Sequence, residues 1–331
     1  MSLTATDAPI GDDVDLTEKT VEVAGRSLWQ ITWGRLRRDR TAMLCVWIMG
    51  FFIVLAIFAP LINHLVGVDP YTPDSSAISD NAGQPYGPWA GASRQHPLGV
   101  EWGTGRDIFA QLVNGLRISL LIAFAATVAA VAIGTVVGII SGYLGGRTDA
   151  FIGRIIDVML SFPSILLLLA LIPVLDDRFS QIGLEGNAAR VLAIILVLAV
   201  FGWPYLARIV RGQVLSLRER EFVESAVAMG SSTTRILFKE ILPNLWAPLL
   251  VYATNLLPGY IAAEAGLSFF GIGILPPETT FGSMLGNSLS YFLLEPSYLF
   301  IPGTVLAILV VAINLLGDSV RDALDPRAGR N

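Results

Sequence analysis

The stretch ISLLIAFAATVAAVAIGTVVGIISGYLGG, residues 118–146, contains no charged side chain. A helix of about 20 predominantly apolar residues crosses the hydrocarbon core of a bilayer, so this stretch is long enough to span a membrane. Other uncharged runs of similar character occur on both sides of it. The sequence therefore predicts an all-α integral membrane protein with six transmembrane helices, at residues 41–63, 118–146, 158–175, 191–207, 241–263 and 296–317.

Small residues recur on one face of the 118–146 stretch. Every fourth residue from position 126 to position 146 is Ala or Gly, which places them along one side of a helix. Helices in lipid gain little from burying apolar groups, so their close approach depends on such residues. We expect Gly134, Gly138 and Gly142 to form a helix-packing face, and the alternative is a smooth face that slides during gating.

The composition places the chain in a bilayer and argues against catalysis. Hydrophobic residues make up 53% of the 331 residues and charged residues only 15%, which is outside soluble globular usage. Neither of the two lysines follows a glycine, so the phosphate-binding Gly-Lys-Ser/Thr pattern is absent. Two histidines and one cysteine suggest no catalytic or metal-binding constellation. We therefore expect a non-enzymatic subunit that binds no cofactor itself.

Basic residues indicate the orientation of the chain. An even number of spans puts both termini on one side, and Lys and Arg concentrate in cytoplasmic segments. With a cytoplasmic N-terminus, 17 of the 22 basic residues fall inside. The predicted organisation is a disordered acidic tail (1–25), a basic segment with the first span (26–66), an external loop or cap (67–117), a transmembrane core (118–317) containing a cytoplasmic loop (208–243), and a cytoplasmic tail (318–331).

The region from 264 to 295 is the hardest to assign from the sequence. Gly266, Gly271 and the pair Pro276-Pro277 interrupt an otherwise apolar stretch. We expect an external loop with a short interfacial helix at about 279–292, and a re-entrant loop is the competing interpretation.

Two carboxylates lie in or near the spans and are candidates for gating or another intramembrane polar role, because burying an uncompensated charge in a membrane is costly. Asp157 is one turn from Arg154, and an i, i+3 ion pair is the simpler explanation there. Glu264 is expected at the outer end of the fifth span, where it would cap the interface. A proton relay through both residues is the alternative.

The largest predicted cytoplasmic loop contains RGQVLSLREREFVESAVAMGSSTTRILFKEILP, residues 211–243. A short helix is expected at about 219–229, with Phe222, Ala226 and Met229 on one face. Gly230 would end this helix in the left-handed conformation. The hydroxyls of residues 231–234 would cap a second helix, Arg235 to Ile241, which Pro243 ends. The result is a helix-turn-helix elbow.

Residues of this elbow resemble the EAA loop of ABC-importer permeases. Glu224, Ala226 and Gly230, followed by Ile241 to Pro243, match its pattern, with Ser225 replacing an Ala and Glu240 standing where an Ile falls. Further stretches, at 96–120, 142–146, 157–163, 263–273 and 314–326, look like the dipeptide, oligopeptide and nickel permease family. The match is greatest to the second permease subunit of that family.

The resemblance implies a type I ABC-importer permease fold in a bacterial inner membrane and the import of short peptides or a similar small solute. It implies a sister permease, two ATPase subunits that bind ATP and Mg, an external substrate-binding protein, the lipid bilayer, and no nucleic acid as partners. The implied ATPase-coupling residues are Glu221, Phe222, Glu224, Ala226, Met229, Gly230 and Arg235. An ion-driven secondary carrier using the two carboxylates is the alternative function, and a membrane scaffold is a third.

Overall fold

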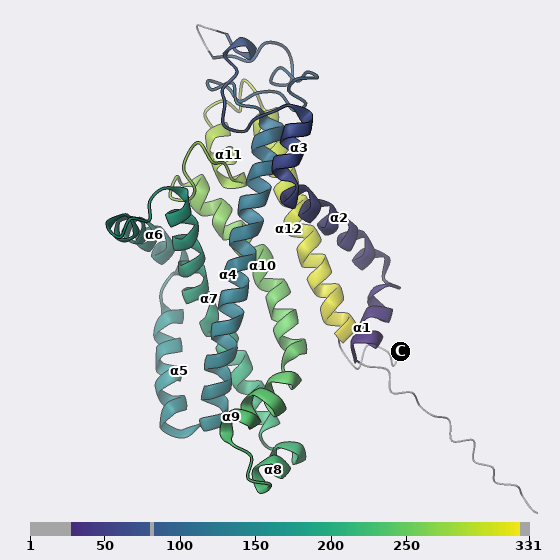
Figure 1. Ribbon diagram of the computed structural model, residues 1–331, viewed down its shortest axis with the longest axis vertical. Coiled ribbons are helices and arrows are strands. Elements are labelled where there is room, and N and C mark those ends of the chain that lie inside the picture. Colours follow the sequence, from purple (N-terminus) through teal and green to yellow (C-terminus); the bar gives the residue numbers. More distant parts are fainter. Residues whose placement is uncertain (1–27, 80–82, 325–331) are drawn as a thin grey trace, which may run out of the picture.

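The computed structural model describes residues 28–79 and 83–324, and this part of the chain folds as an elongated bundle of helices (Figure 1). The acidic tail expected at 1–25 and the last residues of the expected C-terminal tail lie outside the described residues. The helices are α1 (Leu28–Leu36), α2 (Arg40–Ile57), α3 (Ala59–Val66), α4 (Ile108–Leu144), α5 (Gly146–Ser161), α6 (Ser164–Gln181), α7 (Asn187–Leu217), α8 (Glu221–Ala228), α9 (Thr233–Arg235), α10 (Trp246–Phe269), α11 (Phe281–Ser288) and α12 (Ser297–Leu324).

The six expected spans correspond to four continuous helices and two bent pairs in the described part of the chain. α2, α4, α7 and α12 are each long and apolar enough to cross a membrane. The third span is α5 with α6, and the fifth is the segment Thr233–Asn244 with α10. The sequence therefore located the four continuous spans, and all six if each bent pair is one span, although it did not show the two breaks.

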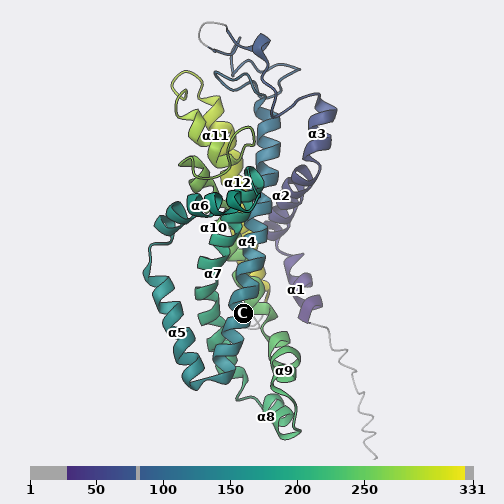
Figure 2. The ribbon, with the colours of Figure 1, turned by 60° about the vertical axis from the view of Figure 1, so that its left-hand side comes forward.

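The break in the third span corrects the prediction of one helix over 158–175. α5 and α6 meet at a bend of 90°, and α6 points sideways out of the bundle (Figure 2). The cause is Pro163, whose ring disfavours helical backbone in the preceding residue. Phe162 is accordingly extended, with φ −85° and ψ 139°.

α10 also runs further than expected. Gly266 does not interrupt it, and the helix continues to Phe269 before Gly271, at φ 75°, turns the chain. The expected short helix at about 279–292 is present as α11, which a Thr280–Ser283 capping box starts.

Residues 67–79 and 83–107 and α11 lie together at one end of the bundle, here called the loop end (Figure 1). α8 and α9 lie at the opposite end, the elbow end. Asp107 accepts a hydrogen bond from the Ala110 amide (2.7 Å) and so starts α4 at Ile108. The last ten residues of the segment expected as an external loop are therefore helical. His96 bridges Asp107 (2.9 Å) and Asp74 (3.2 Å), which ties the loop to this cap.

The glycine face of α4 lies directly against α7. A Cβ atom placed on Gly138 would stand 2.7 Å from the Ala207 carbonyl oxygen and 2.7 Å from the Cβ of Val210. One placed on Gly142 would stand 2.8 Å from the Cβ of Val214. Real Cβ atoms do not approach other atoms this closely, so the two backbones can lie at this distance only because glycine occupies these positions.

We expect Gly138→Ala to destabilise the protein by about 1–3 kcal/mol, because the new methyl group overpacks a contact made partly of backbone. The measurement is thermal unfolding of the purified protein in detergent. Gly212→Ala on α7 is the matched control, since a Cβ there meets no atom within 4 Å. Equal melting temperatures for the two variants would contradict the tight α4–α7 contact.

Candidate coupling elbow

The first arm of the elbow is α8, and its ends are set by local sequence. Two acidic residues, Glu221 and Glu224, lie in its first turn, where they complement the partial positive charge of a helix N-terminus. At the other end Gly230 has φ 75° and donates to the Val227 carbonyl (2.9 Å), and Ser231 donates to the Ala226 carbonyl (3.0 Å). This pair of bonds is a Schellman motif, so the expected left-handed turn at Gly230 is confirmed.

The second arm differs from the expected helix Arg235 to Ile241. Ser232 caps it, because its side chain accepts a hydrogen bond from the Arg235 amide (3.4 Å). α9 then continues as a π-helix over Ile236–Ile241 and as a 3₁₀ turn over Leu242–Asn244. Pro243 sits inside that last turn, where its missing N–H leaves no helical hydrogen bond broken. The arm is thus one irregular helical segment that leads into α10.

The three residues that were expected on one face of the short helix do not share a face in the structure. Val223 and Ala226 are buried, and they share a hydrophobic cluster with Ile236 and Leu237 of the second arm and with Val210 of α7. Ala226 therefore contacts the core of its own chain, and not an outside surface. The i, i+3 spacing of the apolar residues Val223 and Ala226 is the sequence pattern that indicates this buried face.

Phe222 and Met229, which were expected to share a face with Ala226, point outward instead. Met229 is 78% exposed and Phe222 is 39% exposed. Solvent-exposed apolar side chains at the tip of a projecting segment are typical of a surface that meets another protein. Together with the exposed Glu221 and Glu224 they give α8 a mixed apolar and acidic outer face.

The charged groups of the elbow have no ion-pair partner in the part of the chain that the structure describes. This holds for the carboxylates of Glu221 and Glu224 and for the Arg235 guanidinium, all of which are exposed. A projecting helix with unpaired charges can exchange its water contacts for pairs on a second protein. The elbow thus has the chemistry of a docking site.

The bundle next to the elbow is held by ion pairs between helices. Asp149 of α5 accepts from the Arg211 guanidinium of α7 (Nη2, 2.6 Å) and from the Ser141 hydroxyl of α4 (2.6 Å). Asp157 pairs with Arg208, also on α7. The expected pairing of Asp157 with Arg154 is therefore wrong. Its true partner lies 51 residues away in sequence, where no local pattern could indicate it.

Glu264 lies deep in the protein, and not at the interface where it was expected. Its side chain is fully buried and accepts hydrogen bonds from the hydroxyls of Ser119 (2.6 Å) and Ser268 (2.8 Å). Hydroxyl donors offset part of the cost of burying a carboxyl group. The contact joins α10 to α4, whereas Asp157 of α5 pairs with Arg208 of α7, so the two carboxylates have separate partners.

A second polar cluster, which the sequence did not reveal, fixes the loop end. Glu101 is 3% exposed and accepts from Nε (2.9 Å) and Nη2 (2.7 Å) of Arg106. Its other oxygen accepts from the Tyr298 hydroxyl (2.8 Å) and the Asn287 amide (3.3 Å). One carboxylate thereby joins the loop to α11 and α12. Arg106 lies in the 96–120 stretch that resembles the family, but the sequence indicated no partner for it.

A bundle with four to six apolar spans and a projecting charged elbow has the architecture of a multi-pass membrane protein. Residues 134–330 match the family of the binding-protein-dependent transport system inner membrane component, and residues 27–88 match the N-terminal transmembrane domain of oligopeptide transport permease C. The chain belongs to this family, the inner-membrane permease subunits of ABC importers, which are not themselves catalytic.

Curated relatives align along nearly the whole chain. It is 37% identical to the dipeptide transport system permease protein of Alkalihalophilus pseudofirmus, over 91% of this chain and 90% of that protein. It is 36% identical to the oligopeptide transport system permease protein of Bacillus subtilis (97% and 95%) and 36% identical to the glutathione transport system permease protein of Escherichia coli (91% and 91%).

A solved structure shows the same fold. Inward-facing crystals of the MetNI methionine ABC transporter contain a chain that superimposes with a TM-score of 0.52 at 22% identity, covering 66% of this chain and 98% of that one. The expected permease fold is therefore confirmed. The relatives named above are not described as ion-driven carriers, and the pairing of Asp157 and Glu264 with separate partners gives that alternative no support.

Truncating Glu101 to Ala is expected to destabilise the protein by about 3–5 kcal/mol, because it leaves the buried Arg106 charge without a partner. Thermal unfolding in detergent measures the effect. Glu185→Ala, at an exposed position, is the control and is expected to change stability by less than about 0.5 kcal/mol. A Glu101 variant as stable as this control would show that the cluster does not hold the loop end.

Proposed function

We propose that this chain imports short peptides, as one of two membrane subunits whose pathway is opened by ATP hydrolysis on a separate protein. The observation that carries the proposal is the similarity along more than 90% of the chain to permeases named for dipeptide, oligopeptide and glutathione transport. Glutathione is itself a tripeptide, so the three names share one chemical class of substrate.

The elbow is the proposed contact with the ATPase. α8 is exposed on its outer face, carries unpaired carboxylates and projects from the end of the bundle (Figure 2). In this proposal Glu224 pairs with a basic group in a cleft of the ATPase, Phe222 and Met229 fill apolar positions there, and Glu221 and Arg235 form the polar rim. Gly230 holds the angle between the two arms.

Movement of the ATPase would reach the spans through the buried side of the elbow. Val223 and Ala226 belong to the same hydrophobic cluster as Val210 and Val214 of α7, and α7 packs tightly on the glycine face of α4. Close-packed side chains transmit displacement because they have little free volume to absorb it. In this proposal a push on α8 shifts α7 and α4 together.

We propose that the elbow end lies in the cytoplasm. Basic residues gather there, including Arg218, Arg220 and Lys239, as expected for cytoplasmic segments. The loop end then faces the outside and receives the substrate from an external binding protein. A sister permease completes the pathway as a heterodimer, and two ATPase subunits bind ATP and Mg, with no cofactor on this chain.

The coupling role predicts that Glu224→Lys abolishes recovery of the ATPase when the tagged chain is purified from membranes. The sister permease is expected to co-purify unchanged, because the substitution is exposed and leaves the spans intact. Mass spectrometry of the co-purified proteins is the measurement, and Glu185→Lys is the control for adding the same charge elsewhere. An ATPase retained at wild-type level by Glu224→Lys would remove α8 from the contact.

The peptide assignment predicts uptake of trialanine into proteoliposomes that contain the whole complex with its binding protein. Uptake should require hydrolysable ATP on the elbow side, and a protonophore should leave its initial rate unchanged, because no ion gradient drives the step. Radiolabelled trialanine inside the vesicles is the readout. Uptake that persists without ATP and stops with the protonophore would overturn the proposed mechanism.

A further inference from the structure

The segment that joins α1 to α2 carries a concentration of positive charge. Four arginines and one aspartate occupy residues 35–40, which gives this short segment a net charge of +3. Figures 1 and 2 show α1 on the elbow side of α2, next to the end of α12. Since α2 is long and apolar enough to be a span, the charge lies where the chain enters the hydrocarbon core.

Three of the four arginines are exposed and have no ion-pair partner in the described part of the chain. Arg35 donates to the Ala323 carbonyl of α12 (3.4 Å) and so belongs to the contact between these two helices. Arg37, Arg38 and Arg40 are exposed, and no carboxylate of the described residues forms an ion pair with them.

The carboxylates next to this segment do not take up its charge. Asp39 caps α2 by accepting from the Thr41 amide (2.8 Å), and it also accepts from the Ser319 hydroxyl of α12 (2.9 Å). Asp318 and Asp322, in the last two turns of α12, are exposed and form no ion pair with the arginines within the described residues. The three guanidinium groups are therefore open to an anion from outside the chain.

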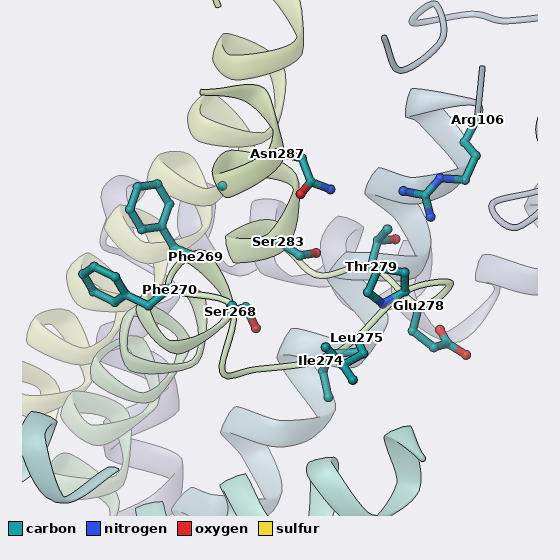
Figure 3. A pocket seen from close by; sticks show the side chains of 13 residues that line it. Arg106, Ser268, Phe269, Phe270, Ile274, Leu275, Glu278, Thr279, Ser283 and Asn287 are labelled. Atoms are coloured by element: carbon teal, nitrogen blue, oxygen red, sulfur yellow. The ribbon is translucent and has the colours of Figure 1, made fainter. Parts of the chain in front are cut away.

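An arginine that holds the fold together is treated differently in this protein. Arg106 lines a cleft of about 300 Å³ at the loop end (Figure 3). It is only 7% exposed, and its Nη2 atom lies 2.7 Å from the buried Glu101 carboxylate. Arg37, Arg38 and Arg40 are neither buried nor paired in this way, so the internal contacts of the chain do not explain them.

Trp33 fixes the position of one of the three exposed arginines. The Cζ atom of Arg37 lies 5.2 Å from the centre of the Trp33 ring, and Trp33 is itself 41% exposed. Stacking on a ring uses the flat face of the guanidinium and leaves its N–H groups free at the edge, where they can donate to phosphate oxygens. Trp side chains concentrate at the level of lipid headgroups. The pair is thus suited to a headgroup contact.

An apolar stripe on α2 begins at Arg40. Leu44, Trp47 and Phe51 follow it at the i+4, i+7 and i+11 spacing of a single helix face. They are 61%, 74% and 62% exposed, so this face of α2 is turned away from the bundle. An exposed apolar face of a membrane span is compatible with acyl chains, which are as apolar as Leu. The face thus has a charged end and an apolar length, as a phospholipid does.

We propose that the turn between α1 and α2 binds an anionic phospholipid, with Arg37, Arg38 and Arg40 on the headgroup and the acyl chains along Leu44 and Trp47. The Cα atoms of Arg37 and Arg40 are at most about 11 Å apart, so the three long side chains can reach one headgroup. Guanidinium groups donate to phosphate oxygens in pairs. A lipid is the occupant because the charged turn continues directly into a face of a membrane span. The inference does not depend on the substrate that is transported.

The test is native mass spectrometry of the full chain in detergent with equal amounts of phosphatidylglycerol and phosphatidylcholine of the same acyl chains. Only phosphatidylglycerol carries a net negative charge, and we expect the wild type to retain it in preference. Replacing Arg37, Arg38 and Arg40 together by Gln should lower the ratio of bound phosphatidylglycerol to phosphatidylcholine at least about tenfold, because basic groups beside a membrane attract anionic lipid.

The matched control removes three other exposed arginines that form no ion pair in the described part of the chain, and it should keep the wild-type ratio. These are Arg94, Arg117 and Arg178, each replaced by Gln. An unchanged ratio in the first triple variant would overturn the proposal. An equal fall in the control would assign the preference to the overall charge of the chain and would also overturn it.

Two further arms separate a lipid from other occupants. Glycerol phosphate, which has the phosphate without acyl chains, should not displace phosphatidylglycerol at equal concentration, and displacement would indicate a site for free anions instead. The complete complex purified from membranes should keep the lipid preference, whereas its loss there would assign this face of α2 to another subunit. If the Gln variant does not fold, the triple Arg→Lys variant replaces it. It keeps the charge, and its ratio should lie below that of the wild type because Lys cannot donate in pairs; a ratio equal to the wild type would overturn the proposed guanidinium contacts.

Discussion

The contact of α4 with α7 is the constraint on which the rest of the structure depends. The two helices approach so closely that a single methyl group at Gly138 or Gly142 would collide with backbone and β-branched side chains. In a membrane the hydrophobic effect gives helices no reason to associate with one another in preference to lipid, so the dispersion contacts of such close packing must supply the attraction. α5 is then joined to this pair by the Asp149–Arg211 and Asp157–Arg208 ion pairs.

The same contact continues into the elbow. Val210 and Val214 pack on one side against the glycine face of α4 and share a cluster with Val223 and Ala226 of α8. α8 is therefore not a loose loop between two spans. Its inner face is part of the bundle, and its outer face, with Met229 and carboxylates that form no ion pair within the described residues, is exposed. The proposed contact with an ATPase requires this division.

The two ends of the molecule differ in whether their charged side chains are buried and paired or exposed. At the loop end Glu101 and Arg106 are buried and form an ion pair. Tyr298 and Asn287 donate hydrogen bonds to the other oxygen of the Glu101 carboxylate. Such a cluster holds segments distant in sequence in one arrangement. At the elbow end Glu221 and Glu224 are exposed and unpaired within the described chain. Glu278 is the exception at the loop end, since its carboxylate accepts hydrogen bonds from the neutral side chains of Tyr71 and Asn114.

The sequence by itself determined what depends on neighbours along the chain. The length of an uncharged run decides whether a helix can cross the bilayer, and this criterion located the four continuous spans and the two bent pairs. Gly230 indicated a left-handed turn because only glycine adopts it without strain. Pro163 indicates the break between α5 and α6, but an assignment of spans from hydropathy alone does not take this residue into account. The local pattern of the elbow, together with the matching stretches along the rest of the chain, was enough to identify the family.

Only the tertiary structure decided which groups meet across the fold. Asp157 pairs with Arg208 and Glu264 bonds to Ser119 at separations of 51 and 145 residues, and neither partner follows from spacing. The direction of Ala226 was likewise undecided until the second arm and α7 were in place around it. A side chain's partner is set by which helices pack together, and that packing depends on shape and distance in three dimensions, which a linear pattern does not contain.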